Sequence, residues 1–210
     1  VMTFLAEGYF KQSNLKVFFE IGFNDHIHNL MELRAHWDVS AAYLYGLRKR
    51  GLFGNKNIIF GVEYLDLIQR TFSDHRGTTA NWFDEEIYNS NSYKGRRWSA
   101  HSGFDSDDFY IYLGYQGSNW TIIPAFNYER HGVVYHFPPE VKIEYRLDIR
   151  YKYEDWILNL YIENEYFENI GFVNSNDNVW LEDPLPNTIR RTNTLIFKLE
   201  HMFSWGFNNY

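Results

Sequence analysis

The chain has 210 residues, of which 20 are Lys or Arg and 27 are Asp or Glu, giving a formal charge of −7. No block of five or six basic residues is present to neutralise phosphates, which excludes a general nucleic-acid binder. The absence of cysteine excludes a disulfide framework and a thiolate metal site. Aromatic residues make up 20 % of the chain, which favours tall strands with ring-lined faces over a helical bundle.

Apolar and polar side chains alternate in several segments that are separated by turn residues. This period of two predicts β-strands rather than helices. The predicted strands cover residues 15–24, 35–47, 56–65, 108–115, 119–129, 141–153, 156–167 and 194–207. No window of about 18 apolar residues occurs, so no transmembrane helix is predicted. The opening VMTFLAEGYF does not resemble a signal peptide, so we expect that an exported form has its natural amino terminus ahead of Val1.

The clearest alternation is VKIEYRLDIRYKY, residues 141–153. It is longer than an average strand of about five or six residues, and it fits a strand that crosses about 25 Å of hydrocarbon while its charged face lines a wet lumen. We expect its charged side chains to form a ladder with neighbouring strands, or alternatively a translocation path: Lys142, Glu144, Arg146, Asp148 and Arg150. In a soluble β-sandwich, the same face would meet water.

The connections between the predicted strands alternate between long and short. The long ones cover residues 25–34, 66–107, 130–139 and 168–193. In an antiparallel meander they all lie at one end, as the extracellular loops of transmembrane barrels do. The sequence therefore predicts an all-β protein, one outer-membrane β-barrel domain over residues 1–210 with about eight strands, whose 66–107 connection is extracellular. A soluble β-sandwich is the alternative.

The 66–107 connection carries the densest chemistry. Its aromatic rings can stack on the apolar faces of sugars, while its charged groups can bind sugar hydroxyls or carboxylates. The predicted glycan-binding residues are Trp82, Tyr88, Tyr93, Arg96, Arg97, Trp98, His101 and Asp105. The alternative is a connection that packs on itself in the mouth of a barrel.

Catalytic and metal-binding patterns are weaker. Adjacent carboxylates occur at 84–85 and 107–108, but adjacency in sequence does not set the separation that a glycosidase needs. The HSG at 101–103 has no accompanying pattern of a catalytic triad. His26 and His28 could begin a metal site, but no third ligand is apparent. We therefore predict no catalytic residues, no metal and no cofactor.

Several stretches between about residues 14 and 130, and more loosely the rest of the chain, resemble a known family. KVFFEIGFNDHIHNLMEL, SAAYLYGLRK, IIFGVEYLDL and YNSNSYKGRRWSAHSGFDSDDFYIYLGY follow in order the carboxyl-terminal half of Wzi-family capsule assembly proteins. A Y.GR element followed by G.DS is the most specific part. The positions that match the family pattern are Glu20, Asp25, Glu63, Tyr93, Gly95, Arg96, Gly103, Asp105 and Ser106.

The resemblance implies a non-enzymatic outer-membrane barrel that binds or organises capsular or other surface polysaccharide. Since the family's barrel has about twice as many strands, it also implies a larger barrel completed by a missing amino-terminal half or by another chain. Eight strands could instead close alone. The alternatives are a porin or transport channel, an interaction subunit of a larger envelope complex, and an outer-membrane lipase or glycosidase. The expected partners are surface polysaccharide and outer-membrane lipid, without nucleic acid.

Overall fold

The described part of the chain is almost entirely β-structure. The computed structural model describes residues 2–23, 31, 34, 41–68, 92–93, 96–97, 105–133, 138–171 and 188–202. The main strands are β1 Met2–Phe10, β2 Leu15–Phe23, β3 Ala41–Leu52, β4 Asn55–Asp66, β7 Ser106–Gln116, β8 Trp120–His131, β9 Glu140–Tyr153, β10 Trp156–Glu168 and β11 Arg190–His201. A 3-10 turn, η1, covers Lys11–Ser13, and the short strands β5 (Ser92–Tyr93) and β6 (Arg96–Arg97) form a pair of their own.

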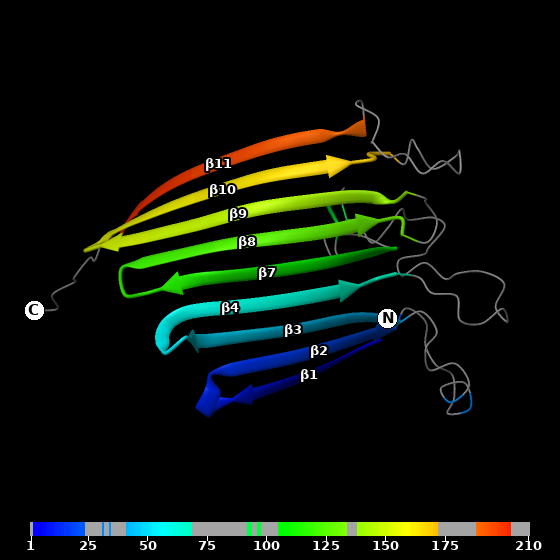
Figure 1. Cartoon of the computed structure of the whole chain (residues 1–210), viewed down its shortest axis with the longest axis horizontal. Helices are drawn as coiled ribbons and strands as arrows, with labels where there is room; N and C mark the ends of the chain where they lie inside the picture. The colour runs from blue at the N-terminus through cyan, green and yellow to red at the C-terminus, as the bar shows by residue number, and fades with distance from the viewer. Residues whose placement is uncertain are drawn as a thin grey trace, which may run out of the picture.

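The nine main strands form one sheet in the order β1-β2-β3-β4-β7-β8-β9-β10-β11, and each pairs antiparallel with its sequence neighbour (Figure 1). The predicted all-β antiparallel meander is confirmed. Within the described ranges, no helix is long and apolar enough to cross a bilayer.

The structure adds one strand to the eight predicted. Strand β1 was missed because Leu5 lies on its polar face and Gly8 on its apolar face, which interrupts the alternation. Two predicted strands extend beyond one of their predicted bounds. The segment predicted at 35–47 corresponds to β3, which continues to a turn at Phe53 and Gly54, where φ is +54° and +76°; residues 35–40 lie outside the described ranges. The last strand begins at Arg190, and residues 203–207 lie outside the described ranges.

The short connections gather at one end of the sheet, as predicted. They are residues 11–14, 53–54, 117–119 and 154–155. At the opposite end of the sheet, strands β2, β4, β8 and β10 end (Figure 1). Strands β3, β7, β9 and β11 begin at this same end. We call this end of the sheet the long-connection end, because the predicted long connections start and finish there.

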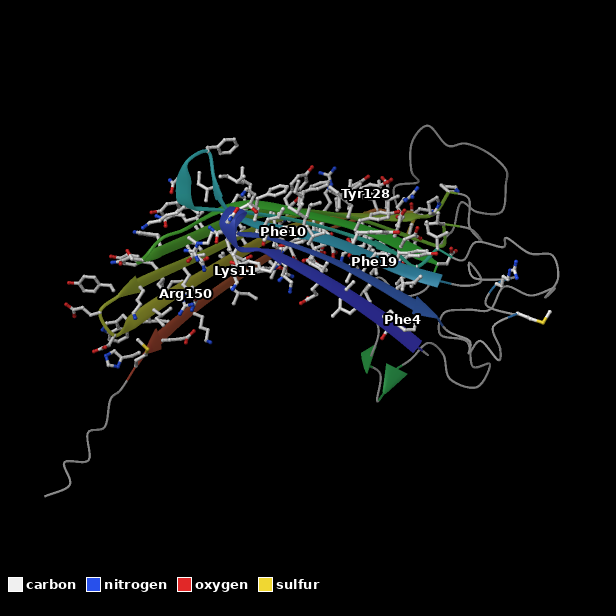
Figure 2. The ribbon with its side chains drawn as sticks, turned by 90° about the horizontal axis from the view of Figure 1, so that it is seen from below. Phe4, Phe10, Lys11, Phe19, Tyr128 and Arg150 are labelled. Carbon is white, nitrogen blue, oxygen red and sulfur yellow. The ribbon has the colours of Figure 1, made fainter. Side chains whose placement is uncertain are left out.

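The sheet is arched and its two faces differ in polarity. Tyr128 lies on the convex side of the arch (Figure 2). Cross-strand register places Phe19, Tyr45, Tyr64 and Phe109 in the same row as Tyr128. Ring centroids are 5.1 Å apart between Phe19 and Tyr45 and 6.5 Å apart between Tyr45 and Tyr64. The convex face is thus apolar along this row, with the charged pair Asp107 and Arg130 at the long-connection end, and the concave face takes the alternating polar side chains.

No second layer covers the convex face among the described residues. Within the described ranges the buried hydrophobic residues are Phe18, Leu67, Ala125 and Ile157, and three of them, Phe18, Ala125 and Ile157, lie in concave rows. On the convex face, Leu195 is 71 % exposed and Phe197 is 65 % exposed. A β-sandwich packs two sheets face to face about 10 Å apart. The described main strands form one sheet, so they do not make the sandwich that was considered as an alternative.

The outer strands β1 and β11 do not pair with each other in the part of the chain that the structure describes. Because the meander has nine strands, β1 and β11 run in the same direction. Direct closure between them would be parallel. Closure by antiparallel pairing would require an odd number of additional strands.

Glycines on the concave face accommodate aromatic rings from the neighbouring strand. Gly46 lies opposite Phe18 in the β2–β3 register, and a Cβ at Gly46 would collide with the Phe18 ring. On β4, Gly61 lies opposite Tyr112 and receives its ring in the same way. A ring that covers a strand glycine fixes the register and protects the backbone.

We predict that Gly46→Ala lowers the free energy of unfolding by about 1–3 kcal/mol, because the Phe18 ring must leave its position. Urea unfolding of the folded protein measures the change. Gly8→Ala is the matched control, since a Cβ there meets its nearest atom, Phe10 Cε2, at 3.6 Å. Equal stability of the two variants would contradict the prediction.

Candidate functional site

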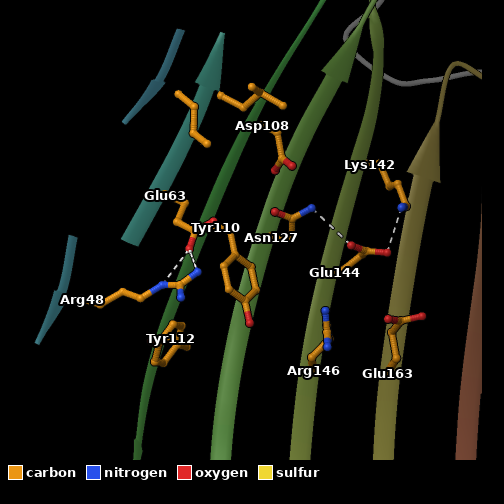
Figure 3. Close-up of a pocket in the computed structure, with 12 residues that line it drawn as sticks. Arg48, Glu63, Asp108, Tyr110, Tyr112, Asn127, Lys142, Glu144, Arg146 and Glu163 are labelled. Atoms are coloured by element: carbon orange, nitrogen blue, oxygen red, sulfur yellow. Dashed lines mark hydrogen bonds and ion pairs between the residues drawn. The ribbon is translucent and has the colours of Figure 1, made fainter. Parts of the chain in front are cut away.

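The concave face holds a cavity of about 680 Å³ between strands β3 and β10 (Figure 3). Charged and aromatic side chains line it at successive concave positions of the strands. Its charged residues are Arg48, Glu63, Asp108, Lys142, Glu144, Arg146 and Glu163. The remaining lining residues are Leu44, Leu65, Tyr110, Tyr112 and Asn127. Alternation along each strand, combined with antiparallel register, brings these side chains together on one face.

An ion pair between Arg48 and Glu63 forms one wall of the cavity. Arg48 donates from Nη2 and Nε to Glu63 Oε1, at 2.7 and 3.2 Å. The Arg48 guanidinium also lies 5.4 Å from the centroid of the Phe18 ring. The Phe18 ring, packed over Gly46, therefore holds the Arg48 guanidinium in position, and the guanidinium in turn orients the Glu63 carboxylate.

Lys142 is the centre of a carboxylate cluster at the long-connection end. Its Nζ lies 2.8 Å from Glu144 Oε1, 3.5 Å from Glu129 Oε2 and 3.8 Å from Glu165 Oε2. Glu129 is 1 % exposed, so its negative charge depends on nearby cations. Arg190 adds a second cation, 3.1 Å from Glu165. Three carboxylates from three strands thus share one ammonium.

Arg146 reaches across the sheet between two tyrosines. Its guanidinium carbon lies 6.0 Å from the ring centroid of Tyr110 on β7 and 5.2 Å from that of Tyr161 on β10. The Tyr161 hydroxyl donates to Glu163, and Asp148 lies 3.6 Å from the Arg146 guanidinium. Cation–π contacts hold the guanidinium in place without using all of its N–H groups.

The predicted ladder on β9 lies on the concave face. Lys142, Glu144 and Arg146 line the cavity. Asp148 lies beside it next to Arg146, and the exposed Arg150 lies toward the short connections, opposite Asn159. The described ion pairs run both along β9 and across to β8 and β10.

Half of the eight predicted glycan-binding residues lie outside the described residues. Trp82, Tyr88, Trp98 and His101 lie outside the described residues, as do His26, His28, residues 84–85, Asp25, Gly95 and Gly103. The backbones of Tyr93 and Arg96 pair in β5 and β6, with Arg97 paired to Ser92. Their side chains lie outside the description.

Asp105 is the one predicted glycan contact whose side chain is described. It is fully buried, with φ of +48°. Its carbonyl oxygen accepts hydrogen bonds from the N–H groups of Gly132 at 2.8 Å and Val133 at 3.2 Å. Asp105 therefore joins the start of β7 to the end of β8, which favours a structural role.

The other described family positions have different surroundings. Glu63 lines the cavity and Ser106 is fully buried. Glu20 faces the concave side from β2, opposite Leu44. Among the described positions that match the family pattern, Glu63 lines the cavity, while Asp105 and Ser106 are fully buried.

The adjacent carboxylates at 107–108 do not form one site. Asp107 lies on the convex face, where its Oδ1 accepts from Arg130 Nε at 2.8 Å, whereas Asp108 lines the cavity. Their separation follows from the alternation of side chains along a strand. Across the described residues, no group of three or more His, Asp or Glu side chains is arranged to hold a metal ion.

Tyr110, Tyr112, Asn127 and Tyr161 are cavity or neighbouring residues that the sequence analysis did not single out. Tyr110 and Tyr112 belong to SDDFYIYLGYQ, where both faces of the strand carry aromatic or apolar side chains. Polarity alternation is therefore weak there. Only the register with β8 and β9 would have assigned these residues to the charged face.

Comparison with known proteins found no matching family model, no matching curated protein and no matching solved structure. The resemblance to Wzi-family proteins rests on the sequence stretches quoted above. What it implies about polysaccharide remains a prediction.

We predict that Lys142→Met lowers the free energy of unfolding by about 3 kcal/mol, because it leaves the buried Glu129 without its nearby ammonium. Urea unfolding measures the difference. The control is Lys198→Met, since Lys198 is 64 % exposed and pairs with Glu200 in solvent; its stability should match that of the unchanged protein. Equal losses in the two variants would show that the carboxylate cluster does not depend on Lys142.

Proposed function

We propose that this chain forms part of the wall of a bacterial outer-membrane β-barrel that binds or organises capsular or other surface polysaccharide without catalysing a reaction. The observation that carries the proposal is the contrast between the two faces of one sheet. The convex face is apolar and exposed, while the concave face holds a cavity with interleaved hydrogen-bond donors and acceptors.

The dimensions of the strands support a location in a membrane. Strand β9 has 14 residues, which at about 3.3 Å per residue makes it about 46 Å long. A tilt of about 45° reduces the span to about 33 Å, enough to cross the hydrocarbon core. Trp120 stacks on Tyr151 with centroids 4.2 Å apart near the short connections. Rings at strand ends are typical of the aromatic girdles of membrane barrels.

The directions of the outer strands support a larger barrel. The described sheet leaves β1 and β11 at its two edges, running the same way. Exposed backbone groups at a sheet edge are not tolerated within lipid. Further strands, from the same polypeptide or from another chain, would close the sheet.

The composition of the cavity supports a polysaccharide ligand. Four carboxylates and three basic groups line it together with two tyrosines and an asparagine. This mixture suits hydroxyl groups, which donate and accept, better than it suits a ligand of one charge. The family resemblance and the aromatic and charged residues of the 66–107 connection point to the same class of ligand.

A diffusion channel is the second candidate, because a charged concave face also suits a water-filled lumen. Conductance across a planar lipid bilayer separates the two functions. Ion-selective current steps would favour the channel, and a silent bilayer would favour the polysaccharide-binding protein.

The membrane location predicts that Phe197→Arg sharply reduces assembly, by about 2–4 kcal/mol, because it places a charge on the lipid-facing side. Thr194→Arg on the same strand is the control, since Thr194 belongs to the concave row of Glu163. Heat-dependent mobility of the protein extracted from outer membranes measures the folded fraction. Equal yields of the two variants would contradict the location.

Polysaccharide binding predicts that the double variant Arg96→Ala, Trp98→Ala retains a folded barrel but loses most cell-bound capsule. Capsule is measured as cell-associated polysaccharide after washing. The control is Arg50→Ala, Phe53→Ala, which removes the same two kinds of side chain at the short-connection end, where Phe53 is 87 % exposed. Unchanged capsule retention in the Arg96 and Trp98 variant would count against the proposal.

A further inference from the structure

We infer that the concave wall contains a binding subsite for an uncharged, hydroxyl-rich sugar unit, formed by Asn127, Arg146 and the rings of Tyr110 and Tyr112. The inference deepens the proposed function and rests on it. It specifies an uncharged sugar as the ligand, and it places a sugar contact in the wall of the proposed barrel, separate from the 66–107 connection.

Asn127 presents an acceptor to the cavity. It is 4 % exposed, and its Nδ2 donates to Glu144 Oε2 at 3.2 Å. That bond fixes the orientation of the amide, so Oδ1 points away from Glu144. This buried Oδ1 has no hydrogen-bond partner among the described residues. Leaving such an atom unsatisfied costs about 1–3 kcal/mol, which a ligand O–H would recover.

Arg146 presents a donor beside it. Residue Ala125 lies opposite Arg146 in the β8–β9 register and two positions from Asn127. Its small side chain lets the guanidinium reach over β8 to Tyr110. The buried Arg146 Nε also has no hydrogen-bond partner within the described ranges. One acceptor and one donor therefore face the same hollow (Figure 3).

This pair of groups selects the ligand's chemistry. A carboxylate or phosphate accepts from Arg146 but cannot donate to Asn127 Oδ1. An ammonium donates to Asn127 Oδ1 but cannot accept from Arg146. A hydroxyl does both. The excess of carboxylates over basic groups in the lining also disfavours a polyanion.

The tyrosines supply an apolar platform. The ring centroids of Tyr110 and Tyr112 lie 5.9 Å apart, and both rings line the cavity. Aromatic faces of this kind pack on the C–H faces of a pyranose. A volume of about 680 Å³ lies within the usual range of small-ligand sites, large enough for more than one sugar unit.

The test is isothermal titration calorimetry on the full chain in detergent, in its native assembly. The neutral probes are maltohexaose, mannohexaose and a galactose hexaose, and the charged probe is hexagalacturonate. We expect at least one neutral hexaose to bind. Asn127→Leu and Arg146→Met should each weaken it about tenfold, and hexagalacturonate should bind at least about tenfold more weakly than that neutral hexaose.

Two matched controls lie on the same face outside the cavity. Asn159→Leu replaces an asparagine that donates to Glu200 at 2.9 Å, and Arg150→Met replaces an arginine on the same strand as Arg146. Both should bind the hexaose within about twofold of the unchanged protein. Heat-dependent mobility verifies folding, and Arg146→Met tests the site even where Asn127→Leu does not fold.

Absence of neutral-hexaose binding, equal losses in site and control variants, or tighter binding of hexagalacturonate would each overturn the inference. Its failure is separable from that of the proposed function. If capsule retention depends on Arg96 and Trp98 but hexaose affinity is unaffected by Asn127→Leu, the polysaccharide role stands and the wall subsite does not. If hexaose binding depends on Asn127 but the Arg96 and Trp98 variant retains normal capsule, the wall subsite stands and the proposed role in capsule retention does not.

Discussion

Backbone hydrogen bonding between neighbouring strands is the interaction on which the rest of this structure depends. The described sheet has a single layer, so it cannot gain its stability from a core enclosed between two layers. Interstrand bonds satisfy the polar backbone within the sheet, and this permits the convex side chains to remain apolar and outward-facing. An apolar surrounding then becomes favourable for a surface that would be costly in water.

The same register that satisfies the backbone organises the concave charges. Glu129, Lys142 and Glu144 come from adjacent strands, and their side chains meet because residues two apart share a face. Isolated buried charges would be destabilising, but a shared ammonium and a nearby guanidinium compensate them. Asn127 and Arg146 differ from this cluster, since each has a polar atom that the described protein groups leave unsatisfied. Fully paired charges and unsatisfied polar atoms therefore occur side by side on the concave face.

Period-two alternation was sufficient to predict most strands, because the polar and apolar faces of an amphipathic strand appear as alternating residues in its own sequence. It failed for β1, where Leu5 occupies a polar-face position, and it could not assign Tyr110 to the cavity. The contact between Arg146 and Tyr110 crosses an intervening strand and depends on the small size of Ala125. Such a contact is a property of three strands in register, which no single segment encodes. The residues of the 66–107 connection were selected by chemical type alone.

The meander also bears on how such a wall can change through evolution. Each strand pairs only with its sequence neighbours, so a strand–turn–strand hairpin is a self-contained unit of the sheet. Duplication or loss of a complete hairpin alters the circumference while leaving every other strand in its original direction. Gain or loss of a single strand would instead reverse all strands on one side of the change and, in the proposed barrel, move their connections to the other side of the membrane. Gene changes that keep the strand directions of the proposed barrel should therefore occur in steps of two strands.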